Sequence, residues 1–504
     1  MTVNAYDVVV IGGGIIGAGA GQHLAAAGYK TALLERGDYG AATSSRTSRL
    51  QHCGLTYFSA ANHSMWNFIG RPAYALECME LARRAMRERG DFVKTSPQRV
   101  RKLEFVVPFN ARSAISGPRA RLAFAIMSLF GKGVPLDLKV MSAGQARQHP
   151  GLQGMADLDD VRGALAFTEY QYVWPERIVV DTVMKARDIG LDAFNYAEVV
   201  GIRRSGSFGW QVDARFADGT NRTFETKAVV NAAGAWVDDI TGLCSNAAPH
   251  LNAGAKGTNA VVRLPASMRG IGMETITPEG APFYLIPWGD LHYAGPWDTP
   301  SEADHAGYRA AEPEVEGILK IMNQVYPGLR LHRDDVLYTW AGVRPRTARD
   351  GEPMGSMEVM EHDLTDRGMT NFFVFTGGLL MTHRDAGRRL TAAVARRLAP
   401  SGPSQPLDYT ARLVPEGDRA TQASVRHAVE NEQARSLEDI LRRRLSLGWD
   451  EDLGLAHVEA VSLIAAPLLG WSEDERRANV AAYVQATTSD FNPREPSRWI
   501  KTHD

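Results

Sequence analysis

The sequence has few cysteines and no excess of charge of either sign. Three cysteines occur in 504 residues, Cys53, Cys78 and Cys244, and their wide spacing supports neither a disulfide framework nor a thiolate metal cluster. We therefore expect a reducing, cytoplasmic environment and no metal site. With 56 basic and 58 acidic residues, the chain lacks the basic excess typical of nucleic-acid-binding proteins, so no nucleic-acid partner is expected.

Long hydrophobic runs are also missing. No apolar stretch reaches the roughly 18 residues that indicate a transmembrane helix, and the start, MTVNAYDVVVIGGG, lacks the charged segment that precedes the apolar run of a signal peptide. Neither a membrane span nor a signal peptide is therefore expected, while peripheral contact with the inner face of the membrane is left open. At 44% hydrophobic content, a chain of this length can bury two or three cores, which favours more than one domain.

The strongest motif lies near the N-terminus. The apolar run DVVVI predicts a buried parallel strand, and Gly12, Gly14 and Gly17 then complete G-x-G-x-x-G at the opening of an alanine-rich helix. The three glycines permit a tight turn, a close approach of backbone to a pyrophosphate, and close helix–strand packing, respectively. Glu35 ends the second apolar run, KTALLE, where an acidic ligand of a ribose belongs. Together these features predict a dinucleotide-binding unit rather than a strand–helix turn without a ligand.

A loop rich in hydroxyl and basic side chains follows, GAATSSRTSRLQHCGLTYF, residues 40–58. By composition alone, it fits either an ordinary solvated loop or a set of contacts to phosphate, sugar or cofactor. The unit lies at the very start of the chain, and regular strand–helix alternation does not continue after the loop, which favours FAD over NAD. Small hydroxyl donors such as Thr43, Ser44 and Ser45 suit a diphosphate or the flavin carbonyls because they add no bulk beside the ring.

Several segments in a fixed order carry a resemblance to a known family. Besides the hydroxyl-rich loop, they are AVVNAAGAWVDD (228–239), YTWAGVRPR (338–346), VFTGGLLMTHRDAGRRL (374–390) and RHAVENEQARSLEDILRRRLSLGW (426–449). Almost end to end, the chain resembles the FAD-dependent glycerol-3-phosphate dehydrogenases within the D-amino-acid oxidase and glycine oxidase superfamily. The resemblance implies hydride transfer from a hydroxyl (or amine) substrate to non-covalently bound FAD, and reoxidation by an acceptor such as a quinone or oxygen. The oligomeric state is left open, a homodimer included.

The resemblance also assigns residues to the cofactor. It places the hydroxyl-rich loop under the isoalloxazine, Val199 and Val200 at the adenine-side backbone contact, and Gly377 and Gly378 before a helix whose amide end points at the flavin. The implied cofactor residues are Gly12, Gly14, Ile15, Ile16, Gly17, Glu35, Arg36, Thr43, Ser44, Ser45, Arg49, Leu50, His52, Val199, Val200, Ala233, Gly234, Trp236, Arg344, Gly377, Gly378, Leu379, Leu380, Met381 and Thr382.

The catalytic candidates are His52, Tyr57, Arg344 and His383, because each lies in a segment that the family pattern places near the flavin. Arg344 stands where the family grips an anionic substrate, and a guanidinium can bind phosphate or carboxylate with paired donors.

The substrate end departs from the family pattern. HGGLRYL, GGKLTTYR and KGSH read here as HCGLTYF, GGLLMTHR and KGTN. Thr56 and Leu379 therefore replace two expected cations, His383 replaces a tyrosine, and Asn259 replaces a histidine assigned to proton transfer. A less charged, larger or more apolar hydroxyl or amine compound than glycerol 3-phosphate is the predicted substrate. The expected pocket aromatics are Trp174, Trp288 and Trp297.

Three functional hypotheses follow from these departures. The first is an FAD-dependent enzyme that oxidises an altered substrate, a polyol, sugar or related alcohol. The second is a genuine glycerol-3-phosphate dehydrogenase with substitute cations, namely Arg46, Arg49 or Arg346. The third is a flavin-binding protein without turnover.

The predicted fold class is α/β, with three domains. A Rossmann-like FAD-binding domain is joined by an antiparallel-sheet substrate domain and, after the Pro/Ser-rich linker APSGPSQPLDY, by a C-terminal helical domain. The predicted boundaries are 1–101, 151–245 and 337–400 for the discontinuous FAD-binding domain, 102–150 and 246–336 for the substrate domain, and 401–504 for the helical domain.

Helical periodicity in the last domain places Leu437, Ile440, Leu441 and Leu445 on one apolar stripe. The arginines of LRRRLSLGW are expected on a solvated helix face rather than in a patch for nucleic acid or membrane.

Overall fold

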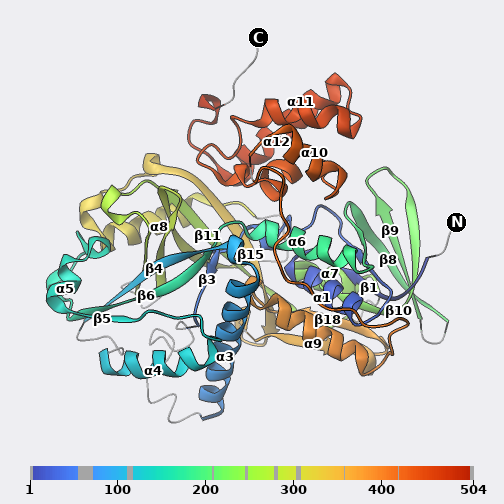
Figure 1. Cartoon of the computed structure of the whole chain (residues 1–504), viewed down its shortest axis with the longest axis horizontal. Coiled ribbons are helices and arrows are strands. Elements are labelled where there is room, and N and C mark those ends of the chain that lie inside the picture. The colour runs from blue at the N-terminus through green and yellow to red at the C-terminus, as the bar shows by residue number, and fades with distance from the viewer. Residues whose placement is uncertain are drawn as a thin grey trace.

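Two β-sheets and a C-terminal group of helices make up the computed structural model of the chain (Figure 1). The predicted architecture, an α/β fold with a Rossmann-like unit, a mainly antiparallel sheet and a helical C-terminal region, is confirmed. The structure describes residues 4–54, 72–110, 117–206, 209–244, 248–276, 282–301, 308–356, 358–417 and 419–499.

The first sheet contains the strands β1 (Asn4–Ile11), β2 (Thr31–Leu34), β7 (Asp192–Phe194), β8 (Ala197–Ser205), β9 (Gly209–Phe216), β10 (Asn221–Asn231), β17 (Met360–Asp363) and β18 (Phe372–Thr376). The strands β18, β10, β1, β2 and β7 lie side by side in that order and run parallel. β17, β9 and β8 are antiparallel additions, and β9 forms a hairpin with β10 around the turn ADGTN (217–221). Val8, Val9 and Val10 are fully buried, as expected for a parallel strand covered on both faces.

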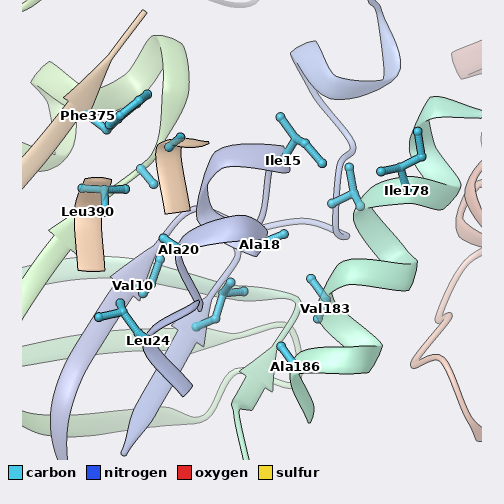
Figure 2. Packing of buried hydrophobic residues seen from close by; sticks show 14 of the residues in the cluster. Val10, Ile15, Ala18, Ala20, Leu24, Ile178, Val183, Ala186, Phe375 and Leu390 are labelled. Atoms are coloured by element: carbon cyan, nitrogen blue, oxygen red, sulfur yellow. The ribbon is translucent and has the colours of Figure 1, made fainter. Parts of the chain in front are cut away.

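Three helices pack on one face of this sheet: α1 (Ile15–Ala26), α6 (Pro175–Asp188) and α9 (His383–Ala395). Figure 2 shows α1 in the middle, with Ile178, Val183 and Ala186 of α6 on one side and Leu390 of α9 on the other. The alanines and glycines of α1 have little side-chain volume, so both neighbouring helices approach it closely. This packing holds the start of α1 at the carboxyl edge of the parallel strands, where ligands of such sheets bind.

The second sheet contains β3 (Leu50–Gln51), β4 (Val100–Phe109), β5 (Lys139–Ser142), β6 (Gly163–Tyr172), β11 (Asn252–Val262), β12 (Ile271–Ile276), β13 (Pro282–Trp288), β14 (Leu291–Ser301), β15 (Val336–Arg349) and β16 (Glu352–Ser356). Its pairings are antiparallel except between β12 and β4. Side chains of α8 (Glu312–Val325) and α5 (Ala143–Gln148) pack on one face, and side chains of α3 (Pro72–Thr95) and α4 (Gly117–Phe130) pack on the other.

Four strands pair differently from the predicted domain division. All four were expected with the FAD-binding segments, but β3 pairs with β6, β6 with β4, β15 with β11 and β16 with β15, so they belong to the second sheet. The reason is that sheet membership depends on hydrogen-bonded partners far away in the sequence, which a boundary drawn along the chain does not capture. The remainder of the predicted division stays a prediction.

The C-terminal region contains α10 (Gln422–Glu430), a π-helical segment (Asp439–Arg444), α11 (Val458–Leu469) and α12 (Glu473–Phe491). The predicted apolar stripe is confirmed, because its four residues are each at most 1% exposed and share one core cluster. No helix in the described part of the chain is long and apolar enough to cross a bilayer.

The prediction for the arginines of LRRRLSLGW is wrong. Arg442, Arg443 and Arg444 are 2%, 3% and 0% exposed, although a helical charge run normally faces solvent. They can be buried because carboxylates and backbone carbonyls surround them; Asp38 alone binds two of the three guanidinium groups.

Candidate functional site

The glycine turn between β1 and α1 has the geometry of a phosphate cradle. Gly12 adopts φ +101°, and a β-carbon there would lie 2.7 Å from the carbonyl oxygen of Ala232. A β-carbon on Gly17 would overlap the carbonyl oxygen of Gly12. Gly14 is the N-cap of α1 and supplies no side chain to cap the helix. The amide end of α1 therefore begins at a glycine turn without bulky side chains of its own, which suits the diphosphate of a dinucleotide.

The carboxylate of Glu35 lies beside this turn. It accepts hydrogen bonds from the backbone N–H groups of Gly13 at 2.6 Å and Gly37 at 2.7 Å. Burial raises the pKa of Glu35, and the two N–H donors oppose that rise. Glu35, the residue predicted to bind the ribose, is thus held at the edge of the glycine turn.

Two more predicted cofactor residues contact one another near this edge. The guanidinium of Arg36 lies 4.2 Å from the ring centroid of Trp236. Trp236 ends the short turn that begins at Gly234, and Ala233 lies just before it, with its Cα 2.8 Å from where a β-carbon on Gly12 would be. Segments some 200 residues apart in the sequence therefore meet at the same turn.

The hydroxyl-rich loop links the two sheets, so its hydroxyls are not simply solvated. Ser44 Oγ accepts a hydrogen bond from the N–H of Ile15 at 3.0 Å, and Thr43 Oγ1 donates to the carbonyl of Val343 on β15 at 2.6 Å. Ser45 Oγ donates to the carbonyl of Gly40. The loop is therefore fixed against both the amide end of α1 and the second sheet.

Arg49 is placed in a buried ion pair. Its guanidinium lies 2.8 Å from Glu176 at the start of α6, and 3.7 Å from the ring centroid of Trp449. Both charged side chains of the pair are fully buried. Since Glu176 already balances its charge, the structure gives Arg49 a role in joining the loop to α6 and to the C-terminal region.

The predicted catalytic residue His52 follows β3, which contains the predicted cofactor residue Leu50. Burial lowers the pKa of His52 to about 4, so the ring is neutral near pH 7. Its Nδ1 accepts a hydrogen bond from the N–H of Gly54 at 3.1 Å, which places the proton of the neutral ring on Nε2. In this tautomer the Nε2–H group of His52 is a hydrogen-bond donor. Two further predicted positions, Thr56 and Tyr57, lie outside the described residues.

Arg344, Gly377 and Gly378 line one pocket. Arg344 lies near the end of β15, and its guanidinium forms an ion pair with Asp298 on β14. Arg346 Nη2 lies 3.9 Å from the same carboxylate. Residues that line the pocket include Arg344, Arg346, Gly377, Gly378, Leu379 and Thr382.

The turn after β18 brings this pocket close to α1. Gly378 adopts φ +86°, and a β-carbon there would lie 3.3 Å from Ile16 Cδ1 in the first turn of α1. Leu380 and Met381 point into the core around α1, at 8% and 4% exposure. Their side chains therefore pack, and a contact of this turn with the cofactor would come from its backbone.

His383 is separated from the other catalytic candidates. It is 2% exposed, its Nδ1 lies 2.8 Å from the carbonyl oxygen of Leu380, and its ring packs edge-on against Phe92. Burial, reinforced by Arg384, lowers its pKa to about 3. His383 lies beside Gly19 of α1 and Phe92 of α3, and it lines a different pocket from the one that Arg344 lines.

The remaining predicted residues lie apart from that pocket. Val199 and Val200 are on β8 at an irregularity in its pairing with β9, and Val200 is 42% exposed. Of the expected pocket aromatics, Trp174 donates to the carbonyl of Arg442, Trp288 donates to that of Trp449, and Trp297 packs against α8. The tryptophans thus support contacts between elements, and the prediction that they surround the substrate finds no support.

Sequence reasoning missed Asp298, Glu169 and the buried carboxylates beside the C-terminal arginines. Asp298 faces Gly257 on β11 in the register of the second sheet. Its one sequence signal is an acidic residue within the strand-like run HYAGPWDTP, close to the end of an expected pocket strand. This signal does not identify the partner of Asp298, because Arg344 lies on another strand, β15.

Glu169 allows a test of how closely this sheet excludes water. Burial raises its pKa from 4.5 to about 7, which Arg89 only partly offsets, and it accepts a hydrogen bond from the N–H of Cys53 at 2.8 Å. Because its pKa is higher in the folded state, the stability it contributes is complete below pH 4.5 and is lost as the pH rises through about 7. The shift corresponds to roughly 3 kcal/mol.

We expect Glu169→Gln to flatten the fall in Tm between pH 5 and pH 8, because glutamine keeps the acceptor but has no proton to lose. Thermal unfolding across this pH range measures the effect. Glu198→Gln, at an exposed carboxylate on β8, is the control and should leave the slope unchanged. An unaltered slope in Glu169→Gln would mean that Glu169 is ionised throughout.

Comparisons with known proteins agree with this geometry. A family model described as "FAD dependent oxidoreductase" matches residues 7–399, and one described as "C-terminal domain of alpha-glycerophosphate oxidase" matches residues 387–476. The glycerol-3-phosphate dehydrogenase of Synechocystis sp. is 26% identical, over 95% of this chain and 96% of that protein. The glycerol-3-phosphate dehydrogenase of Mycobacterium leprae is 27% identical, over 95% and 87%.

Solved structures show the same fold. The glycerol-3-phosphate dehydrogenase from Bacillus halodurans complexed with FAD has a TM-score of 0.72 at 21% identity, and the match covers 96% of this chain and 95% of that one. The L-alpha-glycerophosphate oxidase from Mycoplasma pneumoniae with FAD bound has a TM-score of 0.58 at 15% identity, over 82% of this chain and 99% of that one.

Proposed function

Because the chain belongs to the FAD dependent oxidoreductase family, we propose that it oxidises the hydroxyl group of a polyol, sugar or related alcohol that carries less negative charge than glycerol 3-phosphate. Bound FAD supplies the hydride acceptor in such a reaction. The glycine turn and the amide end of α1 fit the diphosphate of FAD, and Glu35 fits its ribose. The observation that carries the substrate part of the proposal is the ion pair between Arg344 and Asp298.

The charge balance of the Arg344 pocket favours a substrate without a phosphate. Arg344 already has a carboxylate partner, so a substrate anion must compete with Asp298 for its donors. Of the other lining arginines, Arg389 pairs with Glu361 and Arg84 pairs with Glu80, while Arg346 shares the single carboxylate of Asp298 with Arg344. Leu379 adds an apolar surface to the same pocket where the family pattern has a cation.

The protein's own groups then have to orient the hydroxyl-bearing carbon. The paired donors of Arg344 suit the hydroxyls of a polyol as well as an anion, because a guanidinium presents several N–H groups in one plane. His52, neutral and with its proton on Nε2, suits a hydrogen bond to the substrate oxygen. At Gly378 a β-carbon would lie 2.9 Å from Phe375 Cε1 and 3.3 Å from Ile16 Cδ1, so this turn offers its backbone rather than a side chain to a ligand.

A genuine glycerol-3-phosphate dehydrogenase is the second candidate, because relatives of that name align with nearly the whole chain. It requires substitute cations for the phosphate. Of the three proposed substitutes, Arg46 pairs with Asp490 and Arg49 pairs with Glu176, while Arg346 lines the pocket of Arg344. Arg346 is therefore the substitute cation that the described residues support.

Anaerobic reduction of the flavin by candidate substrates tests the proposal. We expect uncharged polyols or sugars to bleach the flavin faster than glycerol 3-phosphate does. If glycerol 3-phosphate bleaches the flavin fastest, the second candidate is favoured. If amines bleach it fastest, the substrate is an amine rather than an alcohol. Failure of polyols, sugars, amines and glycerol 3-phosphate alike would support a flavin-binding protein without turnover.

Asp298→Asn is expected to lower the KM for glycerol 3-phosphate by about tenfold, because it frees the guanidinium of Arg344 to bind the phosphate, and a charge-assisted contact is worth roughly 1.5–3 kcal/mol. Steady-state assays with glycerol 3-phosphate measure the change. The matched control is Asp290→Asn on the same β-hairpin, whose side chain is 71% exposed and lies 3.7 Å from Arg269. An equal effect of both substitutions would argue against competition between Asp298 and the substrate.

A further inference from the structure

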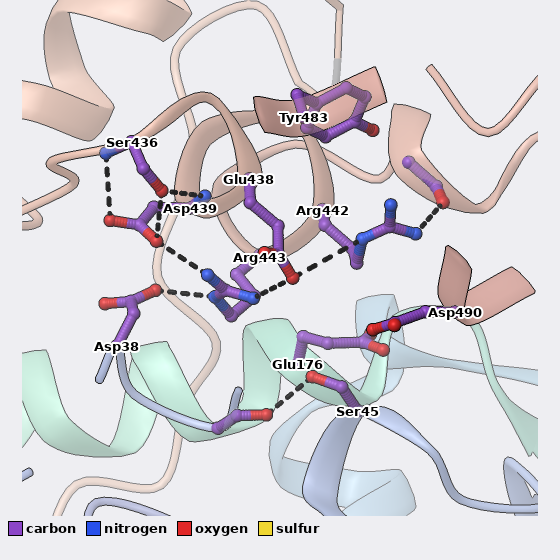
Figure 3. Close-up of polar contacts among 12 residues, drawn as sticks. Asp38, Ser45, Glu176, Ser436, Glu438, Asp439, Arg442, Arg443, Tyr483 and Asp490 are labelled. Carbon is purple, nitrogen blue, oxygen red and sulfur yellow. Dashed lines mark hydrogen bonds and ion pairs between the residues drawn. The ribbon is translucent and has the colours of Figure 1, made fainter. Parts of the chain in front are cut away.

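A buried ion-pair network joins the C-terminal region to the turn that follows Glu35 (Figure 3). Asp38 accepts hydrogen bonds from Arg443 Nε at 2.7 Å and from Arg444 Nη1 and Nη2 at 2.6 and 2.8 Å. These arginines come 405 and 406 residues later in the sequence. Burial by itself would raise the pKa of Asp38, but Arg444 and Arg443 outweigh burial and lower it to about 2. Asp38 is therefore a fully buried carboxylate that stays charged.

The two arginines of the network also have hydrogen-bond partners within the C-terminal region. Arg443 also donates to Glu438 at 3.0 Å and to Asp439 at 2.6 Å, and Asp439 accepts a hydrogen bond from Tyr196. Arg444 donates to the backbone carbonyl of Glu432. Breaking a buried pair by removing one partner leaves an uncompensated charge, which is strongly unfavourable. Loss of the charge of Asp38 would therefore weaken the docking of segment 432–444 in this position.

The segment that contains Asp38, residues 35–40, also contacts the glycine turn between β1 and α1. Glu35, three residues before Asp38, accepts a hydrogen bond from Gly13 N–H, and Gly40 N–H donates to the carbonyl of Gly13 at 3.0 Å. Tyr39, between them, donates to Gln433 Oε1 at 2.9 Å. Residues 35–40 therefore form hydrogen bonds with the glycine turn on one side, and hydrogen bonds and ion pairs with the C-terminal region on the other.

The hydroxyl-rich loop is held by the same region in a second place. Arg46 forms an ion pair with Asp490 at 3.0 Å and lies 4.3 Å from the ring centroid of Phe491. Arg49 lies against Trp449. Both segments assigned to the cofactor, 35–40 and 43–52, therefore contact residues after position 430.

We propose that Asp38 is a positioning residue of the FAD site, through which docking of the C-terminal region and binding of FAD are coupled. The ion pairs of Asp38 with Arg443 and Arg444 fix the backbone of residues 35–38. Glu35 is thereby positioned at the glycine turn before FAD binds. Coupling of this kind is reciprocal, so FAD must also favour the docked C-terminal region. The inference rests on the assignment of Glu35 to the cofactor under the proposed function.

Asp38→Asn tests the coupling with little change of shape. Asparagine keeps an acceptor but leaves the two arginines without their counter-charge, so we expect the Kd for FAD to rise at least tenfold, within the 5- to 150-fold range of typical coupling. Titration of the apoprotein with FAD, followed by flavin fluorescence, measures it at a temperature where circular dichroism shows every variant folded. Asp38→Glu, which keeps the charge, should recover part of the affinity.

The matched control is Arg263→Gln. It breaks an exposed ion pair of 2.6 Å between Arg263 and Glu451, which also reaches the C-terminal region. Both residues are distant in sequence from the two cofactor segments. It should leave the Kd for FAD unchanged. An unchanged Kd in Asp38→Asn, or an equal rise in both variants, would overturn the proposal.

Hydrogen exchange of the native protein gives a test that requires no variant. We expect FAD to slow amide exchange in residues 432–444 as well as in the glycine turn. Protection confined to the glycine turn would overturn the coupling even if Asp38→Asn fails to fold. Both experiments omit substrate, so a protein that shows the coupling but is reduced by none of the tested alcohols would contradict the proposed function alone. A protein that takes up no FAD would overturn both.

Discussion

Gly17→Ala is expected to abolish the uptake of FAD. A β-carbon at this position would overlap the carbonyl oxygen of Gly12, so the glycine turn and the first turn of α1 must move apart. That movement displaces the amide end of α1 from the diphosphate and separates Gly13 from Glu35. We expect the affinity for FAD to fall at least a hundredfold, which corresponds to about 2.7 kcal/mol. Spectrophotometric titration of the purified apoprotein with FAD measures the loss.

Gly21→Ala is the control for this prediction, because Gly21 lies one turn further along the same helix. A β-carbon there would meet methyl groups of Leu191 and Leu33 at 3.2–3.5 Å, which are flexible side-chain ends. It should therefore bind FAD as the native protein does. Normal FAD binding by Gly17→Ala would show that the turn can open without loss of the cofactor site.

Thr56→Arg combined with Leu379→Lys is expected to raise kcat/KM for glycerol 3-phosphate about a hundredfold. The two substitutions restore the cations that the family pattern places at the phosphate, and two charge-assisted contacts of roughly 1.5–3 kcal/mol each account for such a factor. Leu379 lines the pocket of Arg344, so a lysine there reaches the same substrate end. The native substrate should bind less well, because the added charges favour an anion. Steady-state kinetics with both substrates measure the change.

Leu379→Met provides the neutral control, since methionine has a similar volume and no charge. It should leave the preference between substrates unaltered. If the double variant binds FAD yet gains no activity on glycerol 3-phosphate, the lost cations are not what separates this protein from its relatives. Efficient turnover of glycerol 3-phosphate by the native enzyme would have the same consequence.

Local patterns predicted the parts of the site that depend on neighbours in the sequence. The tight glycine turn between β1 and α1 and the apolar stripe in the C-terminal region are present, because each reflects backbone geometry or side-chain periodicity within one or two elements, while the cofactor roles of the glycines and Glu35 stay predictions. The resemblance to the family placed both Arg344 and the glycine pair near the flavin, and in the structure they line one pocket, which no local pattern contains.

Predictions that depended on an unseen partner were wrong or incomplete. A run of three arginines normally indicates a solvated helix face, but here Asp38 and other carboxylates bury it. Arg344 was identified, yet its partner Asp298 was not, because their contact arises from strand pairing between β14, β11 and β15. His383 follows Leu379 closely in the sequence, yet the first turn of α9 carries it into the core.

The sequence by itself therefore determined the dinucleotide-binding turn, the fold class and the residue types available at the substrate end. These follow from the conformational freedom of glycine and from hydrophobic periodicity, which act over a few residues. Only the tertiary structure decided which charges neutralise one another. Charged groups pair wherever the packed elements bring them together, and burial of a charge is tolerated only where that pairing is complete. The contact of Asp38 with arginines more than 400 residues away is the clearest case.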